Sequence, residues 1–323
     1  MQRQKHNSPG AAQLASLTAH HTVSPVAPGV RALEDALRSR YGEAIEAILV
    51  YGSCFRRHTD EGLVDLYVIV DNYRCLDAQS APRWLYRILP PTVFYLQVPL
   101  GERLVRAKYA VLSLADFQRG TSPRWVHSYL WARFAQRTGV LYVRNEHSAL
   151  QVHTALADAV VTFVGRVLPV LPPTFAARDL WRQGLRLTYG TELRPEPSDA
   201  VAGLFDEAPG YYEHATRMAL ECMPFEVRLI EEGDSASYEA MIPWRTRFAS
   251  RLAWIIRKVL GKTLNVLRLL KGLFTFQGGM DYIIWKIERH SGIRLEMPAR
   301  LEQYPWLARV VMLWKLYRRG TTR

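Results

Sequence analysis

Two short segments carry residue types that could bind a nucleoside triphosphate. Tyr51, Gly52 and Ser53 follow an apolar run at 45–50, and Asp65 lies within the next β-rich run. A glycine lets backbone amides approach a triphosphate closely, and a neighbouring serine adds a hydroxyl donor. A carboxylate fixed on a strand is a ligand for Mg²⁺, which neutralises phosphate charge during in-line displacement. We therefore expect Mg²⁺ and a triphosphate to bind between this turn and Asp65.

This spacing resembles the polymerase-β-type nucleotidyltransferase site, with one departure. That pattern places a second acid two residues after the first, where this chain has Tyr67. Asp71 shares strand parity with Asp65, but six residues of straight strand would separate their Cα atoms by about 20 Å. Asp71 is thus a metal candidate only at the end of the strand. From these residues alone, a structural turn with a capping or salt-bridged aspartate remains the alternative.

The surrounding apolar patterns predict an α/β (α+β) fold. Helical spacing at 30–41 precedes the first strand, and helices are expected between the later strands, so we predict a sheet domain over 30–147. Residues 1–29 are predicted to be a flexible leader. The expected strands are 45–50, 63–70, 92–98 and 108–112.

Beyond residue 147 the apolar spacing becomes helical. We predict a helical domain over 148–243 and a basic, amphipathic, membrane-associating region over 244–323. The first should contain two helices within 148–194, separated by the prolines at 169–173, and a third at 211–229. The second should contain helices at 244–261, 263–276, 282–291 and 306–318.

The net charge of +12 is concentrated at the C-terminal end. Residues 245–323 contain 17 basic and 4 acidic side chains, a net +13, whereas the rest of the chain is close to neutral at −1. An anionic partner is expected, either phospholipid or nucleic acid. Tryptophans would lie near lipid headgroups and basic side chains on lipid phosphates. The residues expected to do this are Trp306, Trp314, Arg309, Lys315, Arg318 and Arg319.

Composition excludes several other classes of protein. The chain is 49% hydrophobic and 22% charged, which is typical of a globular fold. Its three cysteines show neither CxxC spacing nor a cluster with histidine, so a disulfide framework or a zinc site is not expected, and a reducing compartment fits best. The histidines show no ligand spacing. We see no secretory signal and no apolar run of membrane-spanning length.

Five short motifs, in order across about residues 45–290, carry a resemblance to a known family. They are 50–53 with 64–71, 107–113, 129–133, 189–194 and 271–278. In these segments the chain resembles the mitochondrial phosphatidate cytidylyltransferase (translocator assembly and maintenance) family, which also has bacterial members. That family has an apolar or aromatic residue where Tyr67 stands. Departures from its pattern are Cys54, Arg56, Arg57 and Asn72.

The resemblance implies transfer of CMP from CTP to phosphatidic acid, with Mg²⁺, giving CDP-diacylglycerol and pyrophosphate. It implies catalytic roles for Asp65 and Lys108. It implies metal ligands at Asp65, Asp71 and Glu192, and nucleotide contacts from Tyr51, Gly52, Ser53, Arg133, Tyr189, Arg194 and Lys271. The implied partners are phosphatidic acid and an anionic membrane, without nucleic acid, and a homo-oligomer is compatible with them. The implied location is peripheral, on the cytoplasmic face of a bacterial inner membrane or the matrix side of a mitochondrial one.

Two other functions remain open at this point. The chain could be a nucleotidyltransferase acting on RNA or a small molecule, in which case the basic region would bind nucleic acid. It could instead be a catalytically degenerate module that binds a nucleotide or lipid. Structural interpretations of single residues also remain: Lys108 as an edge-strand lysine reaching water, Arg133 as a surface salt bridge, and Glu192 with Arg194 as part of a structural network.

Overall fold

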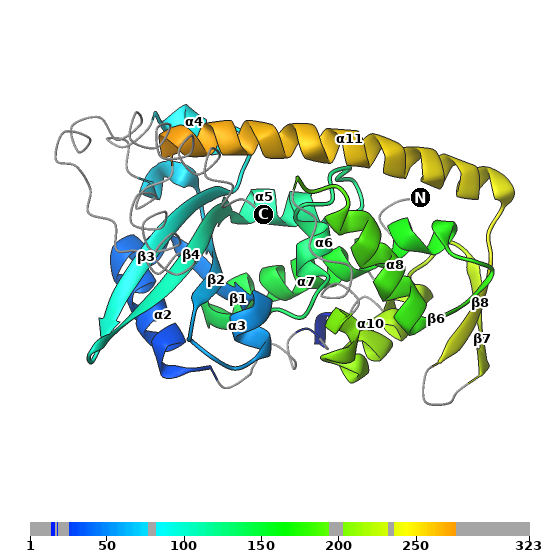
Figure 1. Cartoon of the computed structure of the whole chain (residues 1–323), viewed down its shortest axis with the longest axis horizontal. Helices are drawn as coiled ribbons and strands as arrows, with labels where there is room; N and C mark the ends of the chain where they lie inside the picture. The colour runs from blue at the N-terminus through cyan, green and yellow to red at the C-terminus, as the bar shows by residue number, and fades with distance from the viewer. Residues whose placement is uncertain are drawn as a thin grey trace, which may run out of the picture.

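A mixed five-stranded sheet forms one side of the protein (Figure 1). The structure is a computed structural model that describes residues 14–16, 18, 26–76, 82–193, 203–231 and 236–275. The strand order is β3-β4-β2-β1-β5; β2 and β4 are parallel, and the other pairs are antiparallel. The mixed α/β class predicted from sequence is confirmed. The strands are β1 (Ile45–Tyr51), β2 (Leu63–Val70), β3 (Thr92–Leu100), β4 (Arg103–Ser113) and β5 (Gly139–Val143).

Four of these strands lie where the apolar runs predicted them, and β5 was not predicted. It is a five-residue edge strand whose side chains are mostly half-buried, so its apolar pattern is weak. Gly139 in β5 lies against β1 and α3 (Gly52–Arg56), where an added Cβ would come 2.7 Å from the Phe55 ring and 2.8 Å from Val50. Only glycine permits this close approach.

Helices cover both faces of the sheet. On one face α2 (Pro28–Tyr41) packs against β1, β3 and β4, and its Leu33 and Leu37 belong to a cluster that includes Leu66 and Val68 of β2. On the other face, Tyr67 of β2 belongs to a cluster with three helices. These are α5 (Leu114–Thr121), α6 (Trp131–Phe134) and α7 (Glu146–Val167). Because both faces are covered, β2 is apolar almost throughout, with Asp65 as its acidic exception.

The second hydrophobic cluster continues from the sheet into the middle of the chain. Trp181 of α8 (Ala177–Tyr189) stacks on Phe163 of α7 with ring centroids 4.5 Å apart, and its indole N–H donates to Thr216 of α10 (Pro209–Glu221) at 2.8 Å. The sheet segment and the segment 148–243 therefore share one continuous core. Short helices complete these parts: η2 (Gly42–Ala44), η3 (Tyr73–Cys75), α4 (Arg83–Arg87) and η4 (Leu168–Val170).

A small second sheet differs from the helical pattern expected over 148–243. Its strands are β6 (Thr174–Ala176), β7 (Glu226–Glu231) and β8 (Ser237–Met241), in the order β6-β8-β7. The helix predicted across 211–229 is wrong beyond Glu221. Pro224 cannot continue a helix, and Glu226–Glu231 pairs with β8 instead.

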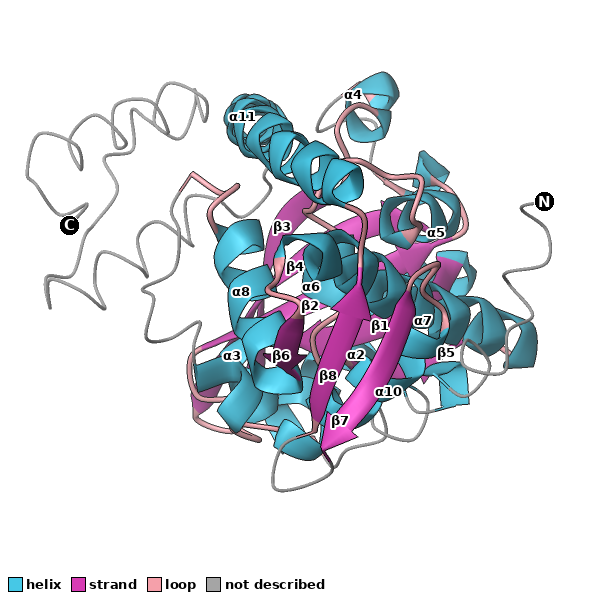
Figure 2. Cartoon of the chain, turned by 90° about the vertical axis from the view of Figure 1, so that its right-hand side faces the viewer, coloured by secondary structure: helices cyan, strands magenta, loops and turns pink. Residues whose placement is uncertain are grey.

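One long helix, α11 (Trp244–Thr275), replaces the two helices predicted over 244–261 and 263–276. It has 32 residues, a length of about 48 Å, and runs along one side of the protein (Figures 1 and 2). Gly261 does not break it: an added Cβ there would lie 2.7 Å from the carbonyl oxygen of Thr191, so glycine allows the helix to pack closely. The helices predicted at 282–291 and 306–318, with their tryptophans and basic side chains, lie outside the described residues.

The span Glu146–Val170, made of α7 and η4, is long and apolar enough to cross a membrane. A span of this length and apolar character was not expected from the sequence. In the structure 67% of the span's most apolar stretch is buried. Its apolar character is explained by its central place in the core, where Val160, Phe163 and Val164 are all fully buried.

Candidate functional site

The turn after β1 lies directly against Asp65. Antiparallel pairing places Tyr51 opposite Asp65, so the chain leaves β1 beside the carboxylate. Gly52 has φ of +83°, and an added Cβ would lie 2.9 Å from Asp65 Oδ2. Glycine is required here both by the backbone conformation and by this contact. The short helix α3 then begins at Gly52, with the exposed Ser53 in its first turn.

Lys108 forms an ion pair with Asp65. Parallel pairing of β2 and β4 places the two residues side by side, and Lys108 Nζ lies 3.1 Å from Asp65 Oδ1. Burial favours the neutral amine, but Asp65, by its charge and hydrogen bond, and the Tyr51 oxygen together outweigh burial and raise the pKa of Lys108 above its ordinary value. Lys108 therefore stays charged at neutral pH. Because β4 lies between β3 and β2, the edge-strand interpretation of this lysine is wrong.

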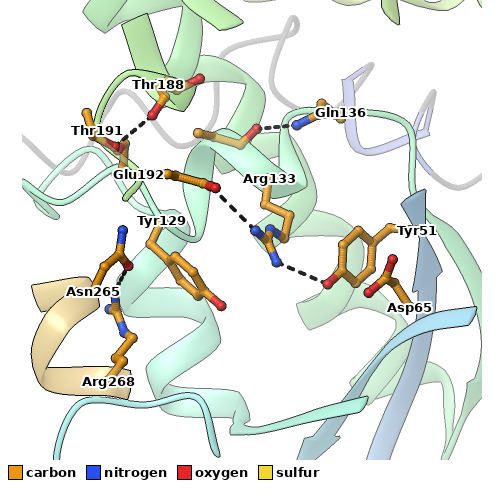
Figure 3. A network of polar contacts seen from close by, with 12 residues as sticks. Tyr51, Asp65, Tyr129, Arg133, Gln136, Thr188, Thr191, Glu192, Asn265 and Arg268 are labelled. Carbon is orange, nitrogen blue, oxygen red and sulfur yellow. Dashed lines mark hydrogen bonds and ion pairs between the residues drawn. The ribbon is translucent and has the colours of Figure 1, made fainter. Parts of the chain in front are cut away.

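Arg133 of α6 connects the Asp65 region to the helical part of the chain. Its Nη1 donates to the Tyr51 hydroxyl at 3.0 Å, and its Nη2 lies 3.6 Å from Glu192 Oε1 (Figure 3). Its guanidinium also stacks over the Tyr129 ring at 4.8 Å. Burial opposes the charge, but the phenol oxygens of Tyr51 and Tyr129, with other partners, keep the pKa of Arg133 above its ordinary value. Arg133 is thus a half-buried cation within this site.

Glu192 reaches the site from the segment after α8. The backbone there turns back on itself: Glu192 N donates to the Tyr189 carbonyl at 2.9 Å, and the Thr191 hydroxyl donates to the Thr188 carbonyl at 2.7 Å. Glu192 faces Arg133 from the opposite side of the site to Asp65 (Figure 3), and Tyr189 lines the same pocket.

One open pocket of about 530 Å³ brings most of the sequence-predicted residues together. Its wall includes residues from the sheet, from α6 and from the end of α8, so it lies between the two halves of the shared core. The sequence-predicted residues that line it are Tyr51, Gly52, Ser53, Asp65, Lys108, Arg133, Tyr189 and Glu192.

Three further cations line the pocket, Arg56, Arg57 and Arg137, and sequence reasoning did not assign them to a site. Arg56 forms an ion pair with Glu207, which also lines the pocket. The lining thus carries five basic side chains against the carboxylates of Asp65, Glu192 and Glu207, and its net charge is positive. The adjacent arginines Arg56 and Arg57, three residues after Ser53, are the sequence feature that could have predicted this positive charge, although in the sequence they stood out only as a departure from the family pattern.

Two sequence-predicted residues lie elsewhere. Asp71 is exposed at the other end of β2 from Asp65, where its carboxylate accepts the Asn72 side-chain amide at 2.9 Å. A straight strand keeps the two acids apart, so Asp71 cannot share a metal ion with Asp65. Lys271 is buried on α11, away from the pocket, and its amine donates to the carbonyls of Ile88 and Leu89, both at 3.1 Å. It anchors α11 to the loop before β3. Arg194 lies outside the described residues.

Position 67 belongs to the core and not to the site. The Tyr67 ring is fully buried and meets Phe134 edge to face, with centroids 4.8 Å apart. Within the described ranges, no cluster of three or more His, Cys, Asp or Glu side chains could hold a metal ion. Mg²⁺ commonly takes only one or two carboxylates, with substrate phosphates and water completing its shell. Asp65 and Glu192 provide two carboxylates in one pocket.

No protein-family model matches the chain, and no curated protein shows significant sequence similarity to it.

Proposed function

We propose that the chain is a Mg²⁺-dependent nucleotidyltransferase that transfers CMP from CTP to phosphatidic acid, giving CDP-diacylglycerol and pyrophosphate. The observation that carries the proposal is the contact of Gly52 and Lys108 with Asp65 at the edge of a positively charged pocket. A glycine-serine turn leading into a helix, beside an antiparallel strand that carries one aspartate, also supports a polymerase-β-like sheet domain.

The pocket residues suit the charges of this reaction. The lipid phosphate is already an anionic nucleophile, so the protein mainly needs to position it and to neutralise charge. An oxygen of that phosphate forms a bond to the α-phosphorus of CTP, and the bond from the α-phosphorus to the bridging oxygen breaks, releasing pyrophosphate. Gly52 and Ser53 would hold the triphosphate, while Lys108 and Arg133 would offset its charge, Arg133 as a planar donor.

Asp65 would hold the Mg²⁺ ion, with substrate phosphates and water completing its shell, because Glu192 lies on the other side of Arg133. A carboxylate suits this metal, because carboxylate oxygens are its preferred protein ligands. When bound, the ion would supply charge neutralisation and orientation of the phosphates. Lys108 Nζ lies 3.1 Å from Asp65 Oδ1, so an ammonium group stands beside the proposed metal ligand.

The outer face of α11 supports a membrane as the place of reaction. Its apolar side chains follow helical spacing along the solvent side, and Trp244 is 71% and Val259 64% exposed. The exposed apolar residues of α11 are Trp244, Phe248, Leu252, Ile255, Ile256, Val259, Val266, Leu267, Leu269, Leu270 and Phe274. A soluble helix normally turns such a stripe toward the core. An exposed stripe of this length is typical of an interfacial helix.

Two cations of α11 have the opposite arrangement. Arg257 donates to the Val126 carbonyl at 3.1 Å and Lys271 to the loop before β3, so these cations point inward. Other cations are exposed beside the apolar stripe: Arg245, Arg251, Lys258 and Lys262. Each basic side chain near an anionic bilayer contributes about 1 kcal/mol of binding. Apolar residues gathered on one helix face favour lipid over RNA, because RNA binding uses aromatic rings interleaved with arginine along a groove.

These features are consistent with a peripheral protein on the cytoplasmic face of a bacterial inner membrane or the matrix face of a mitochondrial inner membrane. Phosphatidic acid, the proposed acceptor, is itself an anionic lipid of such surfaces, so one docking event would bring the enzyme to both its membrane and its substrate.

Incubation with α-labelled CTP, Mg²⁺ and phosphatidic acid in mixed micelles tests the reaction. We expect label in the organic phase with the unmodified protein, and at least about a hundredfold less with Asp65→Asn, because the variant lacks the carboxylate charge. Chelation of Mg²⁺ should abolish the signal. Equal label with both proteins, or none with either, would contradict the proposal. Parallel reactions with RNA ends as acceptor test the other nucleotidyltransferase class.

A further inference from the structure

The ring of Tyr129 lies between two guanidinium groups (Figure 3). Arg133, which lines the proposed triphosphate pocket, has its Cζ 5.2 Å from the Tyr51 ring centroid and 4.8 Å from that of Tyr129. Arg268 of α11 has its Cζ 4.3 Å from the Tyr129 centroid. A cation within about 6 Å of a ring centroid is attracted to the aromatic face. Tyr129 therefore connects a residue of the site with the inner face of α11.

The direction of the Arg133 guanidinium depends on its side-chain contacts. Its helix, α6, has only four residues. The Tyr51 hydroxyl accepts from Nη1 at 3.0 Å, but the ion pair with Glu192 spans 3.6 Å and sets a direction only weakly. The face of the Tyr129 ring is thus one of the main supports of this planar donor.

Arg268 is bonded differently from the cations that anchor α11. Arg257 and Lys271 donate to backbone carbonyls outside the helix. Arg268 donates to Asn265 of its own helix at 3.3 Å, and its Nε is buried with no hydrogen-bond partner in the described part of the chain. Burial also lowers the pKa of this guanidinium below its ordinary value. Burying a cation in this way costs free energy, so anchoring of the helix does not explain its place, whereas the contact with Tyr129 does.

We propose that Arg268 and Tyr129 are positioning residues: Arg268 holds the Tyr129 ring, and the ring holds the Arg133 guanidinium in the direction that the reaction needs. This inference rests on the proposed function, in which Arg133 is a planar donor to the triphosphate. Without Arg268 the ring would be free to turn, and Arg133 would keep its charge but lose its direction. The helix α11 would thus contribute to the site without touching the substrate.

Loss of direction should affect turnover more than binding. Attraction of a triphosphate in the ground state depends mainly on the number of cations, whereas a planar donor must point to the oxygens where charge develops in the transition state. We expect Arg268→Met to lower kcat about tenfold and to change KM for CTP by less than about threefold. Tyr129→Leu should do the same, while Tyr129→Phe keeps the ring and should keep most of the activity.

Two combined variants test whether these residues act through one another. Arg268→Met together with Tyr129→Leu should lower kcat no further than either substitution alone, because both remove the same support. Arg133→Lys keeps the charge and removes the planar donor, so Tyr129→Leu should have little further effect in that background.

Arg247→Met is the matched control. Arg247 is also a half-buried arginine of α11, but it lies near the other end of the helix and donates to the carbonyls of Leu171 and Ile242. We expect its kcat within about twofold of the unmodified protein. Thermal melting of each variant shows whether it is folded.

A nuclear magnetic resonance measurement on the full chain follows Arg133 without turnover. The ¹⁵N–¹H resonance of its Nε–H group is identified by its absence from Arg133→Lys, and it is sensitive to the nearby Tyr129 ring. Arg268→Met should shift this resonance, and Arg247→Met should not.

A folded Arg268→Met protein with an unshifted resonance overturns the inference, and so does one with normal kcat. Equal kcat of Tyr129→Leu and Tyr129→Phe overturns it as well, even if Arg268→Met does not fold. If the unmodified protein transfers no CMP while Arg268→Met still shifts the resonance, the proposed function fails and the positioning of Arg133 stands.

Discussion

The pocket at the Asp65 end of β2 and the outer face of α11 are built in opposite ways. In the pocket, charged groups converge: Lys108 lies 3.1 Å from Asp65, and Arg133 lies 3.6 Å from Glu192. On α11, the apolar side chains point to solvent while Arg257 and Lys271 bond to carbonyls of the protein body. The pocket carries more basic than acidic side chains, and this excess of positive charge indicates an anionic ligand. An apolar stripe in water indicates an apolar surface.

Substitutions in the pocket and substitutions on α11 should therefore have separate effects. Changes in the pocket should remove nucleotide chemistry and leave membrane binding intact, and changes on α11 should do the reverse. The helix also contacts the site through its inner face, since Arg268 stacks over Tyr129 at 4.3 Å and Asn265 lines a small pocket that shares Arg133 and Glu192 with the site. Substitutions on the outer face alone are needed to test this separation.

Lys108→Met should have the largest effect. It removes the ammonium beside Asp65 and leaves the carboxylate to repel the triphosphate, so we expect cytidylyl transfer to fall at least about a hundredfold. Lys108→Arg keeps the charge and should retain more activity. Initial rates with labelled CTP measure both, and co-sedimentation with vesicles should be unchanged. Near-normal transfer by a folded Lys108→Met protein would exclude this lysine from the site.

The double substitution Ile255→Ser and Val259→Ser should weaken binding to vesicles that contain phosphatidic acid by at least about tenfold, because each methylene withdrawn from the bilayer costs about 0.8 kcal/mol. Affinity for CTP should not change. Leu150→Ser is the matched control, since Leu150 is a comparably exposed leucine on α7. An equal loss for the control would mean that α11 is not the docking surface.

Lys271 should give stability a distinctive pH dependence. Burial, with the nearby charge of Arg268, lowers the pKa of Lys271 to about 7, against about 10.4 for a lysine in an unfolded chain. Between these values the unfolded state binds more protons, so the free energy of unfolding should rise with pH. From pH 7 to pH 9 the rise should be about 1 to 3 kcal/mol larger than in Lys271→Met. Urea unfolding at several pH values measures this difference. If the free energy of unfolding changes equally with pH in both proteins, this amine does not titrate as expected.

Asp71→Asn should have the smallest effect. Asp71 is exposed and bonded to Asn72, at the other end of the strand from Asp65. We expect cytidylyl transfer within about twofold of the unmodified protein and a stability change within about 0.5 kcal/mol. The same assay with Asp65→Asn provides the contrast. A large loss of activity in Asp71→Asn would mean that the two ends of β2 act together.

Local features of this chain could be predicted because their causes are local. Apolar runs and turn residues indicate β1, β2 and the Gly52 turn between them, and the alternation of side chains indicates that Asp65 stands apart from an apolar strand. Composition alone located the basic C-terminal quarter. The five motifs suggested Lys108, Arg133 and Glu192 as partners of Asp65, but they did not indicate how these residues meet.

Long-range pairing decided the rest. Parallel pairing of β4 with β2 places Lys108 beside Asp65, and a shared core brings Glu192 to Arg133 from about sixty residues further along the chain. Tertiary packing also assigned Lys271 to an anchor of α11, kept Asp71 away from the site and turned the apolar face of α11 outward. A sequence pattern records which faces of a helix or strand differ, but only the packing of distant segments decides which face meets the core and which charges meet each other.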